Sequence, residues 1–325
     1  MFTRIIRATV APRNTSKVRL RSVIAWAGIQ RPERYWQHAV RSSTRRLSCR
    51  SAKVWAMRFS DVQAAEFFDQ GWTVVEGLFS LDEMRTARTA FERLYGAAQG
   101  LRTTQDHDGA YFVLEAPPKG EVIVKRVVWA GGAEPDLLAL SADPRLIEPA
   151  LDLLGSDHCE QLLCQAHFKM PRDGVSFDWH QDVQHRDKGP GTWQDLNGRG
   201  SYVQTIMLID DMTEANGPLK FIPRSAVRGG DTLRLSADSY DYNTPMGRTD
   251  KPAPFDESQA VTITGPAGTV LFFGPYAIHG SMANESDIPR RVLINGYAYP
   301  GANGRVYPGR GSGRTLRRPT VVQRD

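Results

Sequence analysis

Cysteine and long apolar runs are both scarce in this sequence. Its 325 residues include three cysteines, an odd number that shows neither the spacing of a zinc site nor that of a disulfide framework. We therefore expect Cys49, Cys159 and Cys164 to be reduced thiols, as in a cytosolic-type compartment. The apolar run at residues 23–29 is too short for a membrane span, which takes about 20 residues, and no secretory pattern follows it. No internal repeat is visible either.

Acidic residues are almost absent from the start of the chain. Residues 1–57 hold thirteen lysines and arginines but a single acid, Glu33, whereas the remainder holds 28 basic and 35 acidic residues. The net charge of +5 therefore comes from this leader, and the rest of the chain is mildly acidic. Nothing in the rest of the chain indicates a nucleic-acid-binding groove, so neither a nucleic-acid partner nor a membrane is expected for it.

The basic leader at residues 1–56 has three interpretations. Its Arg- and Ser-rich, acid-poor composition is typical of an organellar transit peptide. A basic tail could instead bind nucleic acid or anionic lipid, and the segment could also be an artefact of start-site choice. We favour a disordered leader or such an artefact, and hence a cytoplasmic protein, with an organelle as the alternative if the leader is a transit peptide.

We expect a chain that begins at Met57 to fold and to be as active as the full chain, because the charge balance changes sign at this boundary. A capped helix follows soon after it. Comparing the melting temperature and the turnover of the two chains tests this, and a large loss of either would mean that the leader packs on the rest.

The first part of the chain predicts helices. Apolar residues recur at helical spacing from Ser60 until Gly71 stops the run. Ser80 and Glu83 have the spacing of a capping box, which marks the start of a second helix. A third helix is expected from residue 142 to the stop at Gly155. Between these helices we expect strands at 72–75 and 121–128 and a polar loop at 98–120.

From residue 160 the sequence predicts mainly strands. Residues 203–210 and 218–223 are expected to form a hairpin through Asn216-Gly217. Residues 183–200, directly after His180-Gln181-Asp182, form a long loop that we interpret as a lid. Residues 228–257 form a polar insertion that is a second candidate for substrate contact. The Gly- and Arg-rich tail at 301–325 is expected to be disordered or loosely attached. Further strands are expected at 163–169, 261–264, 269–273 and 290–298.

This order of elements, helices first and then many short strands, predicts a single domain at residues 57–300. We expect it to be mainly β with flanking helices, arranged as a β-sandwich or jelly roll.

The triplet His180-Gln181-Asp182 is the strongest candidate for a metal site. In an extended strand, residues i and i+2 point to the same side, so the imidazole and the carboxylate would project together. A lone His-x-Asp is a weak signal, but His279 offers a third ligand and Arg290 follows it. Two histidines and one carboxylate with open positions are typical of non-haem Fe(II) oxygenases, although the same ligands could hold zinc. The planar fork of an arginine pairs well with the far carboxylate of a keto acid.

Several motifs together resemble a known family. They are Trp179-His180-Gln181-Asp182, Asn216-Gly217-Pro218-Leu219, Ile222-Pro223-Arg224-Ser225, Phe272-Phe273 through His279-Gly280-Ser281, and Arg290. With these, residues 57–299 resemble the phytanoyl-CoA dioxygenase family of Fe(II)- and 2-oxoglutarate-dependent oxygenases.

The resemblance implies a double-stranded β-helix that uses Fe(II), 2-oxoglutarate and O2 to oxidise a small-molecule substrate, with release of succinate and CO2. It makes His180, Asp182 and His279 the iron ligands. Related halogenases have a small residue in place of Asp182, so this carboxylate favours hydroxylation or another oxidation.

The resemblance also implies residues that hold the co-substrate. The family's spacing from its distal histidine selects Arg290 rather than Arg291 for the far carboxylate of 2-oxoglutarate. Gln181, Ser281 and Lys125 fall at positions that often lie near 2-oxoglutarate, although Lys125 could equally be a solvated edge charge.

Other polar residues are candidates for the pocket. Gln165, His167 and Lys169 share one face of a strand, which is either a cavity wall or the solvent face of an edge strand. His185 either faces the site or lies in solvent. The alternative to an enzyme is a non-catalytic small-molecule-binding protein on the same scaffold, and the sequence specifies neither the substrate nor the oligomeric state.

Overall fold

The computed structural model of the chain describes residues 59–226 and 255–318. The predicted leader, most of the 228–257 insertion and the last residues of the tail lie outside these ranges. None of the helices within them combines the length and apolar character that a membrane crossing requires. Cys159 and Cys164 are buried and form no disulfide.

The three predicted helices are present with the predicted caps, although the second runs three residues beyond the expected start of the loop at residue 98. Helix α2 (Asp61–Gln70) is capped by Ser60 and ends at Gly71, whose φ of 96° is left-handed. Helix α3 (Leu81–Leu101) carries the predicted capping box of Ser80 and Glu83 and buries one apolar stripe. Helix α5 (Pro144–Leu154) ends at Gly155, also left-handed. The short helices α4 (Pro135–Leu140) and α6 (Val183–Arg186) were not predicted.

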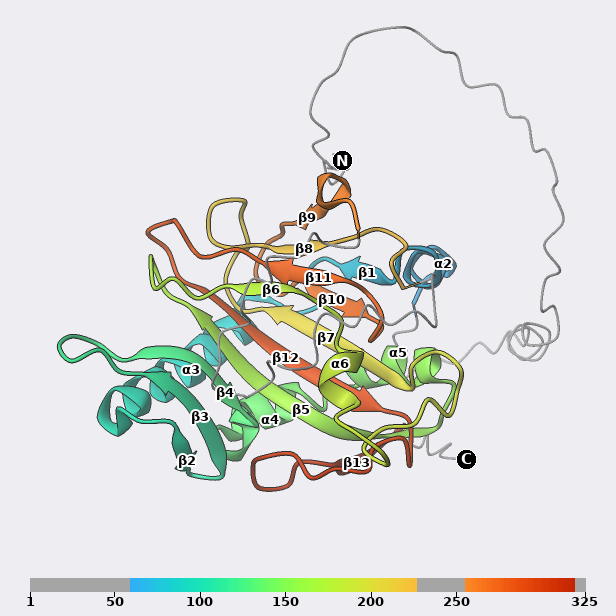
Figure 1. Cartoon of the computed structure of the whole chain (residues 1–325), viewed down its shortest axis with the longest axis horizontal. Coiled ribbons are helices and arrows are strands. Elements are labelled where there is room, and N and C mark those ends of the chain that lie inside the picture. Colours follow the sequence, from blue (N-terminus) through green and yellow to red (C-terminus); the bar gives the residue numbers. More distant parts are fainter. Residues whose placement is uncertain (1–58, 227–254, 319–325) are drawn as a thin grey trace, which may run out of the picture. The chain divides into compact units, whose positions relative to one another are not determined.

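Two sheets face each other across the domain (Figure 1). The larger has nine strands in the described residues, in the order β1-β10-β7-β12-β5-β4-β3-β2, with β13 also on β5, and the smaller has the order β6-β11-β8-β9. The larger sheet contains β1 (Trp72–Val75), β2 (Gln105–His107), β3 (Ala110–Glu115), β4 (Ile123–Val128), β5 (His158–Lys169), β7 (Tyr202–Leu208), β10 (Val270–Phe273), β12 (Arg290–Ala298) and β13 (Arg314–Arg317). The smaller contains β6 (Phe177–His180), β8 (Leu219–Phe221), β9 (Val261–Ile263) and β11 (His279–Ser281).

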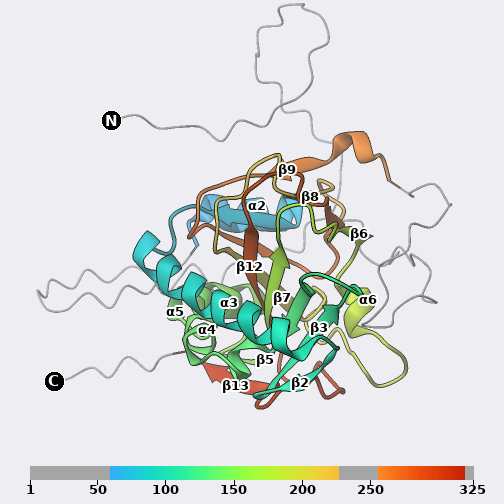
Figure 2. The same cartoon turned by 90° about the vertical axis from the view of Figure 1, so that its left-hand side faces the viewer.

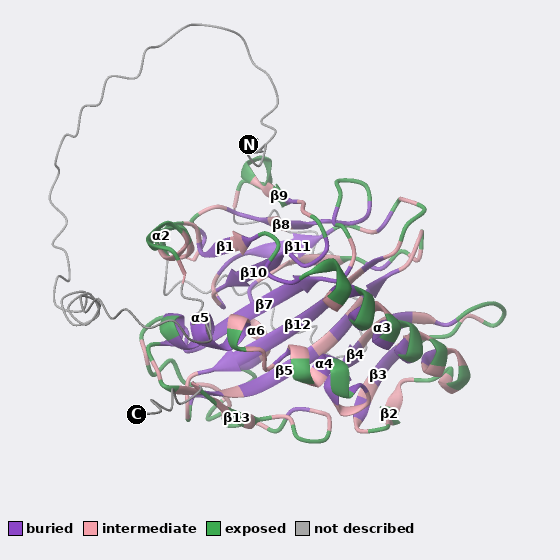
Figure 3. Ribbon diagram, turned by 180° about the vertical axis from the view of Figure 1, so that it is seen from behind, coloured by how far each residue is buried: buried purple, intermediate pink, exposed green. Residues whose placement is uncertain are grey.

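Side chains on the central strands point alternately to the two faces of the larger sheet, and each face has its own hydrophobic core. On β7, Val203 and Met207 pack with the helices, whereas Ile206 and Leu208 pack with the smaller sheet. Helices α3 and α4 lie over the outer face of the larger sheet, as the view from behind shows (Figure 3), and the quarter turn of Figure 2 shows α3 running along it. The inner face is covered by the smaller sheet. This is the predicted jelly roll with flanking helices.

The predicted hairpin between residues 203–210 and 218–223 is wrong. β7 pairs with β10 and β12 in the larger sheet, whereas β8 pairs with β9 and β11 in the smaller one. The turn at Asn216-Gly217 therefore carries the chain from one sheet to the other. Gly217 is required there, because its φ is 78° and a Cβ would lie 2.6 Å from the carbonyl oxygen of Met282.

The tail is also better ordered than predicted. Strand β13 pairs with β5, Tyr307 is buried, and the indole of Trp129 donates to the carbonyl of Arg310 at 2.7 Å. Glycine permits this packing, since a Cβ on Gly309 would lie 2.2 Å from Trp129. The glycines of the tail therefore let its backbone pack closely against the domain, and the composition did not indicate disorder here. The loop expected at 98–120 likewise contains two strands, β2 and β3.

Candidate active site

Two histidines of the smaller sheet are direct cross-strand neighbours. His180 ends β6 and His279 begins β11, and the two residues are partners in the antiparallel register. Side chains at such positions lie on the same face within contact distance, and the ring centroids are 4.2 Å apart. Pairing of the two strands therefore brings together residues that are about a hundred positions apart in the sequence.

Asp182 reaches this pair from a turn rather than from a strand. β6 ends at His180, and Asp182 has helical backbone angles at the start of α6, so the prediction of an extended His-x-Asp is wrong in its geometry. The carboxylate still turns toward the histidines, with its Oδ1 3.9 Å from Nε2 of His180. One ligand atom from each of His180, Asp182 and His279 lies within 4.8 Å of the others.

The surroundings of the three residues suit a divalent metal. Nδ1 of His180 lies 2.7 Å from the carbonyl of Asp178, and Nδ1 of His279 lies 3.0 Å from that of Ala277. Each carbonyl accepts from Nδ1–H, which leaves Nε2 as a lone-pair donor. Burial, and then the neighbouring His279, lower the pKa of His180 to about 4, so this imidazole is neutral at pH 7. Oδ2 of Asp182 is buried without a hydrogen-bond partner in the described residues, as expected of a carboxylate that needs a cation.

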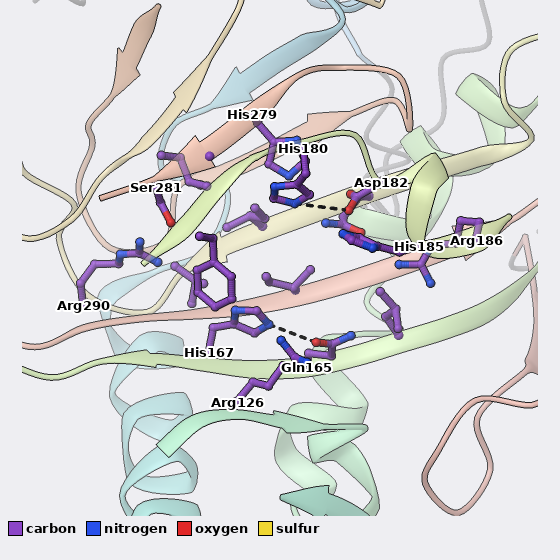
Figure 4. A pocket seen from close by; sticks show the side chains of 18 of the residues that line it. Arg126, Gln165, His167, His180, Asp182, His185, Arg186, His279, Ser281 and Arg290 are labelled. Carbon is purple, nitrogen blue, oxygen red and sulfur yellow. Dashed lines mark hydrogen bonds and ion pairs between the residues drawn. The ribbon is translucent and has the colours of Figure 1, made fainter. Parts of the chain in front are cut away.

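The triad opens onto a cavity between the two sheets. Its empty space, counted with the open solvent at its mouth, is about 870 Å³. Figure 4 shows Arg290 on one side of the triad and Arg186 on the other, with Arg126 and Gln165 opposite it. The polar residues that line the cavity are Arg126, Gln165, His167, His180, Asp182, His185, Arg186, Lys188, Gln204, His279, Ser281 and Arg290.

Arg290 faces the cavity and Arg291 faces away from it, as predicted for neighbours on a strand. Arg290 is buried and donates from Nε and Nη2 to the carbonyl of Gly217, with an Nε–O distance of 3.1 Å. Burial lowers its pKa to about 10, so it stays charged. Arg291 is not the exposed charge that was expected, because it pairs with both oxygens of Asp210 at 2.8 and 2.9 Å.

A lysine lies beside Arg290. Lys169 is its partner across β5 and β12 and is fully buried. Its Nζ donates to Oγ of Ser281 at 2.8 Å and to the carbonyl of Met282. Burial, together with Arg290, lowers the pKa of Lys169 to about 5. This lysine therefore fixes the Ser281 hydroxyl, which lines the cavity, and does not itself line it.

Most of the remaining predicted residues are brought into the cavity. Gln165, His167 and His185 all line it, and β5 is not an edge strand, so the face shared by Gln165 and His167 is a cavity wall. The ring of His167 lies 3.0 Å from Oε1 of Gln165. Burial lowers the pKa of His167 well below its usual range.

Besides Lys169, two predicted residues do not line the cavity. Lys125 is the extra residue of a bulge between β3 and β4, and it forms an ion pair with Glu115 at 2.7 Å. Of the two alternatives for Lys125, this placement favours a charge at the edge of the domain over a residue near 2-oxoglutarate. Gln181 donates from Nε2 to the carbonyl of Tyr276 at 2.6 Å and is absent from the described lining.

Sequence reasoning missed three basic residues of the cavity, Arg126, Arg186 and Lys188. Arg126 follows Lys125 on the same strand, and neighbours on a strand point to opposite sides, so one of the two was expected to face inward. Arg186 and Lys188 belong to the segment that was interpreted as a lid, where no periodicity was available to orient them.

Comparisons with known proteins agree with this geometry. A sequence model of the phytanoyl-CoA dioxygenase family matches residues 67–292. The ectoine dioxygenase of Bordetella parapertussis is 28% identical over 257 residues, which cover 74% of this chain and 77% of that protein. The L-proline trans-4-hydroxylase of Streptomyces griseoviridis is 30% identical over 168 residues, which cover 47% of this chain and 59% of that protein.

Solved structures share the fold. The crystal structure of EctD from S. alaskensis with 2-oxoglutarate and 5-hydroxyectoine has a TM-score of 0.57 at 24% identity, covering 79% of this chain and 82% of that one. EvdO2 from Micromonospora carbonacea, in complex with 2-oxoglutarate, has a TM-score of 0.53 at 19% identity, covering 75% and 93%. The chain belongs to the phytanoyl-CoA dioxygenase family and is an Fe(II)- and 2-oxoglutarate-dependent dioxygenase that acts on a small-molecule substrate.

Proposed function

We propose that His180, Asp182 and His279 bind Fe(II) and that Arg290 binds the far carboxylate of 2-oxoglutarate. The observation that carries the proposal is that the triad and Arg290 face one cavity. Within the described residues, no carboxylate lies within salt-bridge distance of Arg290, whose guanidinium donates to the carbonyl of Gly217. A buried guanidinium without a carboxylate suits a ligand that brings its own.

The iron, when bound, supplies the oxidative chemistry of the reaction with O2 and 2-oxoglutarate. The protein's part is to orient its ligands. The carbonyls of Asp178 and Ala277 hold the two imidazoles with Nε2 turned inward. His180, Asp182 and His279 would hold the iron, and a set of two histidines and one carboxylate would leave it able to take the co-substrate and O2.

Arg290 and Ser281 together form the proposed binding site for the far carboxylate. Both line the cavity, and Ser281 is held by Lys169 at 2.8 Å. Because the Ser281 hydroxyl already accepts from Lys169, its own proton is available to a carboxylate oxygen. Arg290, which stays charged, also gives this end of the cavity a positive potential before any ligand enters.

Anaerobic titration of the protein with Fe(II) and 2-oxoglutarate tests the proposal. We expect a weak visible charge-transfer band that saturates with both ligands, because the keto acid chelates the bound iron. Zn²⁺ in place of Fe²⁺ should give no band. A protein that binds 2-oxoglutarate without this band, and releases no succinate in air with any substrate, would instead be a non-catalytic binding protein.

A further inference from the structure

The cavity carries more positive charge than the co-substrate explains. Four cationic side chains line it, Arg126, Arg186, Lys188 and Arg290, against the single carboxylate of Asp182. The two positive charges of Fe(II) and the two negative charges of 2-oxoglutarate cancel, so their binding leaves this excess in place. One of the four, Arg290, is assigned to 2-oxoglutarate, and the other three lie elsewhere in the cavity.

Arg186 is the most buried of the three cations Arg126, Arg186 and Lys188. It is 4% exposed, and its Nη1 donates to the hydroxyl of Tyr307 at 2.7 Å. Its guanidinium lies 4.8 Å from the ring centroid of Tyr202 and 5.3 Å from that of Tyr307. The two tyrosines thus fix the orientation of a charge that cannot be lost, since arginine stays protonated.

One donor of Arg186 has no partner among the described residues. Its Nε is buried there without a hydrogen bond, and the hydrogen bond of its Nη1 goes to the Tyr307 hydroxyl and not to a carboxylate. Leaving a buried charged donor unpaired is costly. A purely structural arginine at this place would have its Nε satisfied by the protein, whereas one that binds an anionic ligand keeps a donor for it.

Lys188 lies near Arg186, and Arg126 adds positive charge from the opposite wall of the cavity. Lys188 follows α6 and is exposed. Burial of part of its stem, with Arg305 and Arg186 nearby, lowers its pKa to about 8, so most of it is charged at pH 7. Arg126 comes from β4, where it pairs in register with His167. Figure 4 shows Arg186 and Arg290 on opposite sides of the triad, with Arg126 across from it.

We propose that Arg186, with Lys188 and Arg126, binds an anionic group of the organic substrate, so that the substrate is a small carboxylic acid. Its charged end would lie at Arg186 and the carbon to be oxidised beside His180, Asp182 and His279, while 2-oxoglutarate occupies the side of Arg290. This inference rests on the function proposed above, because it assumes that Arg290 is engaged by the co-substrate.

Matched pairs of acids and amides test the charge requirement directly. The protein is loaded anaerobically with Fe(II) and 2-oxoglutarate and titrated with small carboxylic acids, L-proline and ectoine among them, and with the primary amide of each. Perturbation of the charge-transfer band reports binding beside the iron. We expect acids to bind and their amides to bind at least about tenfold more weakly, since a charge-assisted pair is lost. In air, the same acids should stimulate succinate release.

Variants of Lys188 and Arg186 then test whether these two residues bind the negative charge of the acids. Lys188→Met removes an exposed charge without a risk to folding, and Arg186→Met removes the buried one while keeping an apolar stem. Each should weaken acid binding at least about tenfold and leave amide binding and the 2-oxoglutarate titration unchanged. Arg186→Lys should restore part of the acid affinity. Lys119→Met, at an exposed lysine that does not line the cavity, is the matched control.

The outcomes separate this inference from the proposed function. Absence of the band in the wild-type protein would count against the function itself. A normal band overturns the anionic-substrate proposal in three cases: amides bind as tightly as acids, no acid in the panel binds, or Lys188→Met and Arg186→Met both keep wild-type affinity for acids. If Arg186→Met does not fold, Lys188→Met and the acid–amide pairs decide.

Discussion

Replacing Asp182 with alanine should abolish most substrate oxidation while leaving the metal-free protein folded. Asp182 supplies the only carboxylate among the described residues that line the cavity, and its loss removes one of three proposed iron ligands. Turnover should therefore fall by more than the roughly 10–100-fold that follows loss of a group that only supports a ligand. Iron content and succinate release, measured together, report the effect.

Stability distinguishes a metal ligand from a structural carboxylate. Oδ2 of Asp182 is buried without a partner, so in the metal-free protein this charge destabilises the fold. We expect Asp182→Ala to leave the free energy of unfolding of the metal-free protein unchanged or to raise it by about 1 kcal/mol. Added Fe(II) should stabilise the wild type and not the variant. Asp187→Ala, at an exposed carboxylate on the same segment, is the control, and wild-type turnover with wild-type iron content in Asp182→Ala would show that Asp182 is not a ligand.

The parts of the fold that depend on local chemistry could be predicted from the sequence. Ser80 and Glu83 satisfy the free amides at a helix start wherever they occur at this spacing, and Gly71 adopts the left-handed angle that ends a helix. Alternation also predicts that Arg290, Val292 and Ile294 share one face of β12, and all three line the cavity, although the family's spacing was needed to select that face as the inner one. None of these features requires knowledge of a distant partner.

The parts that depend on distant partners could not be predicted. Asn216-Gly217 is a good hairpin signal, yet β8 finds its partners in another sheet, because strand pairing is decided by long-range contacts that a turn motif does not encode. Lys125 lies at a bulge between β3 and β4, and the sequence did not reveal this irregularity. The tail was misjudged because composition alone could not reveal the surface of β5 and Trp129 on which it packs.

The candidate site shows the same division. His180, Asp182 and His279 could be found from ligand type and family spacing, although the turn at Asp182 could not. Arg186 depends on the tail, since Tyr307 accepts its hydrogen bond and offers its ring. Because the tail was expected to be disordered, the sequence could not show that its Tyr307 orients Arg186 in the cavity.

Replacing Arg290 with alanine should raise the 2-oxoglutarate requirement roughly 100-fold or more. Removing one partner of a buried charge pair costs on the order of 3–5 kcal/mol, and about 1.4 kcal/mol corresponds to a tenfold change in affinity. Arg290→Lys should recover only part of this loss, because an ammonium lacks the planar fork that matches a carboxylate. The 2-oxoglutarate affinity is measured from the anaerobic charge-transfer titration.

Arg291→Ala is the matched control, and its expected defect is of another kind. Arg291 lies on the opposite face of β12 and pairs with Asp210 at 2.8 and 2.9 Å, while Arg88 also contacts Asp210 at 3.1 Å. Its loss leaves Asp210 with the Arg88 side chain and the backbone N–H of residue 291 as partners. We therefore expect the free energy of unfolding to fall by about 1–3 kcal/mol and the 2-oxoglutarate affinity to change less than about tenfold. Urea denaturation and the same titration separate the two effects. If Arg291→Ala lost the co-substrate and Arg290→Ala kept it, the assignment of Arg290 to the far carboxylate would be wrong.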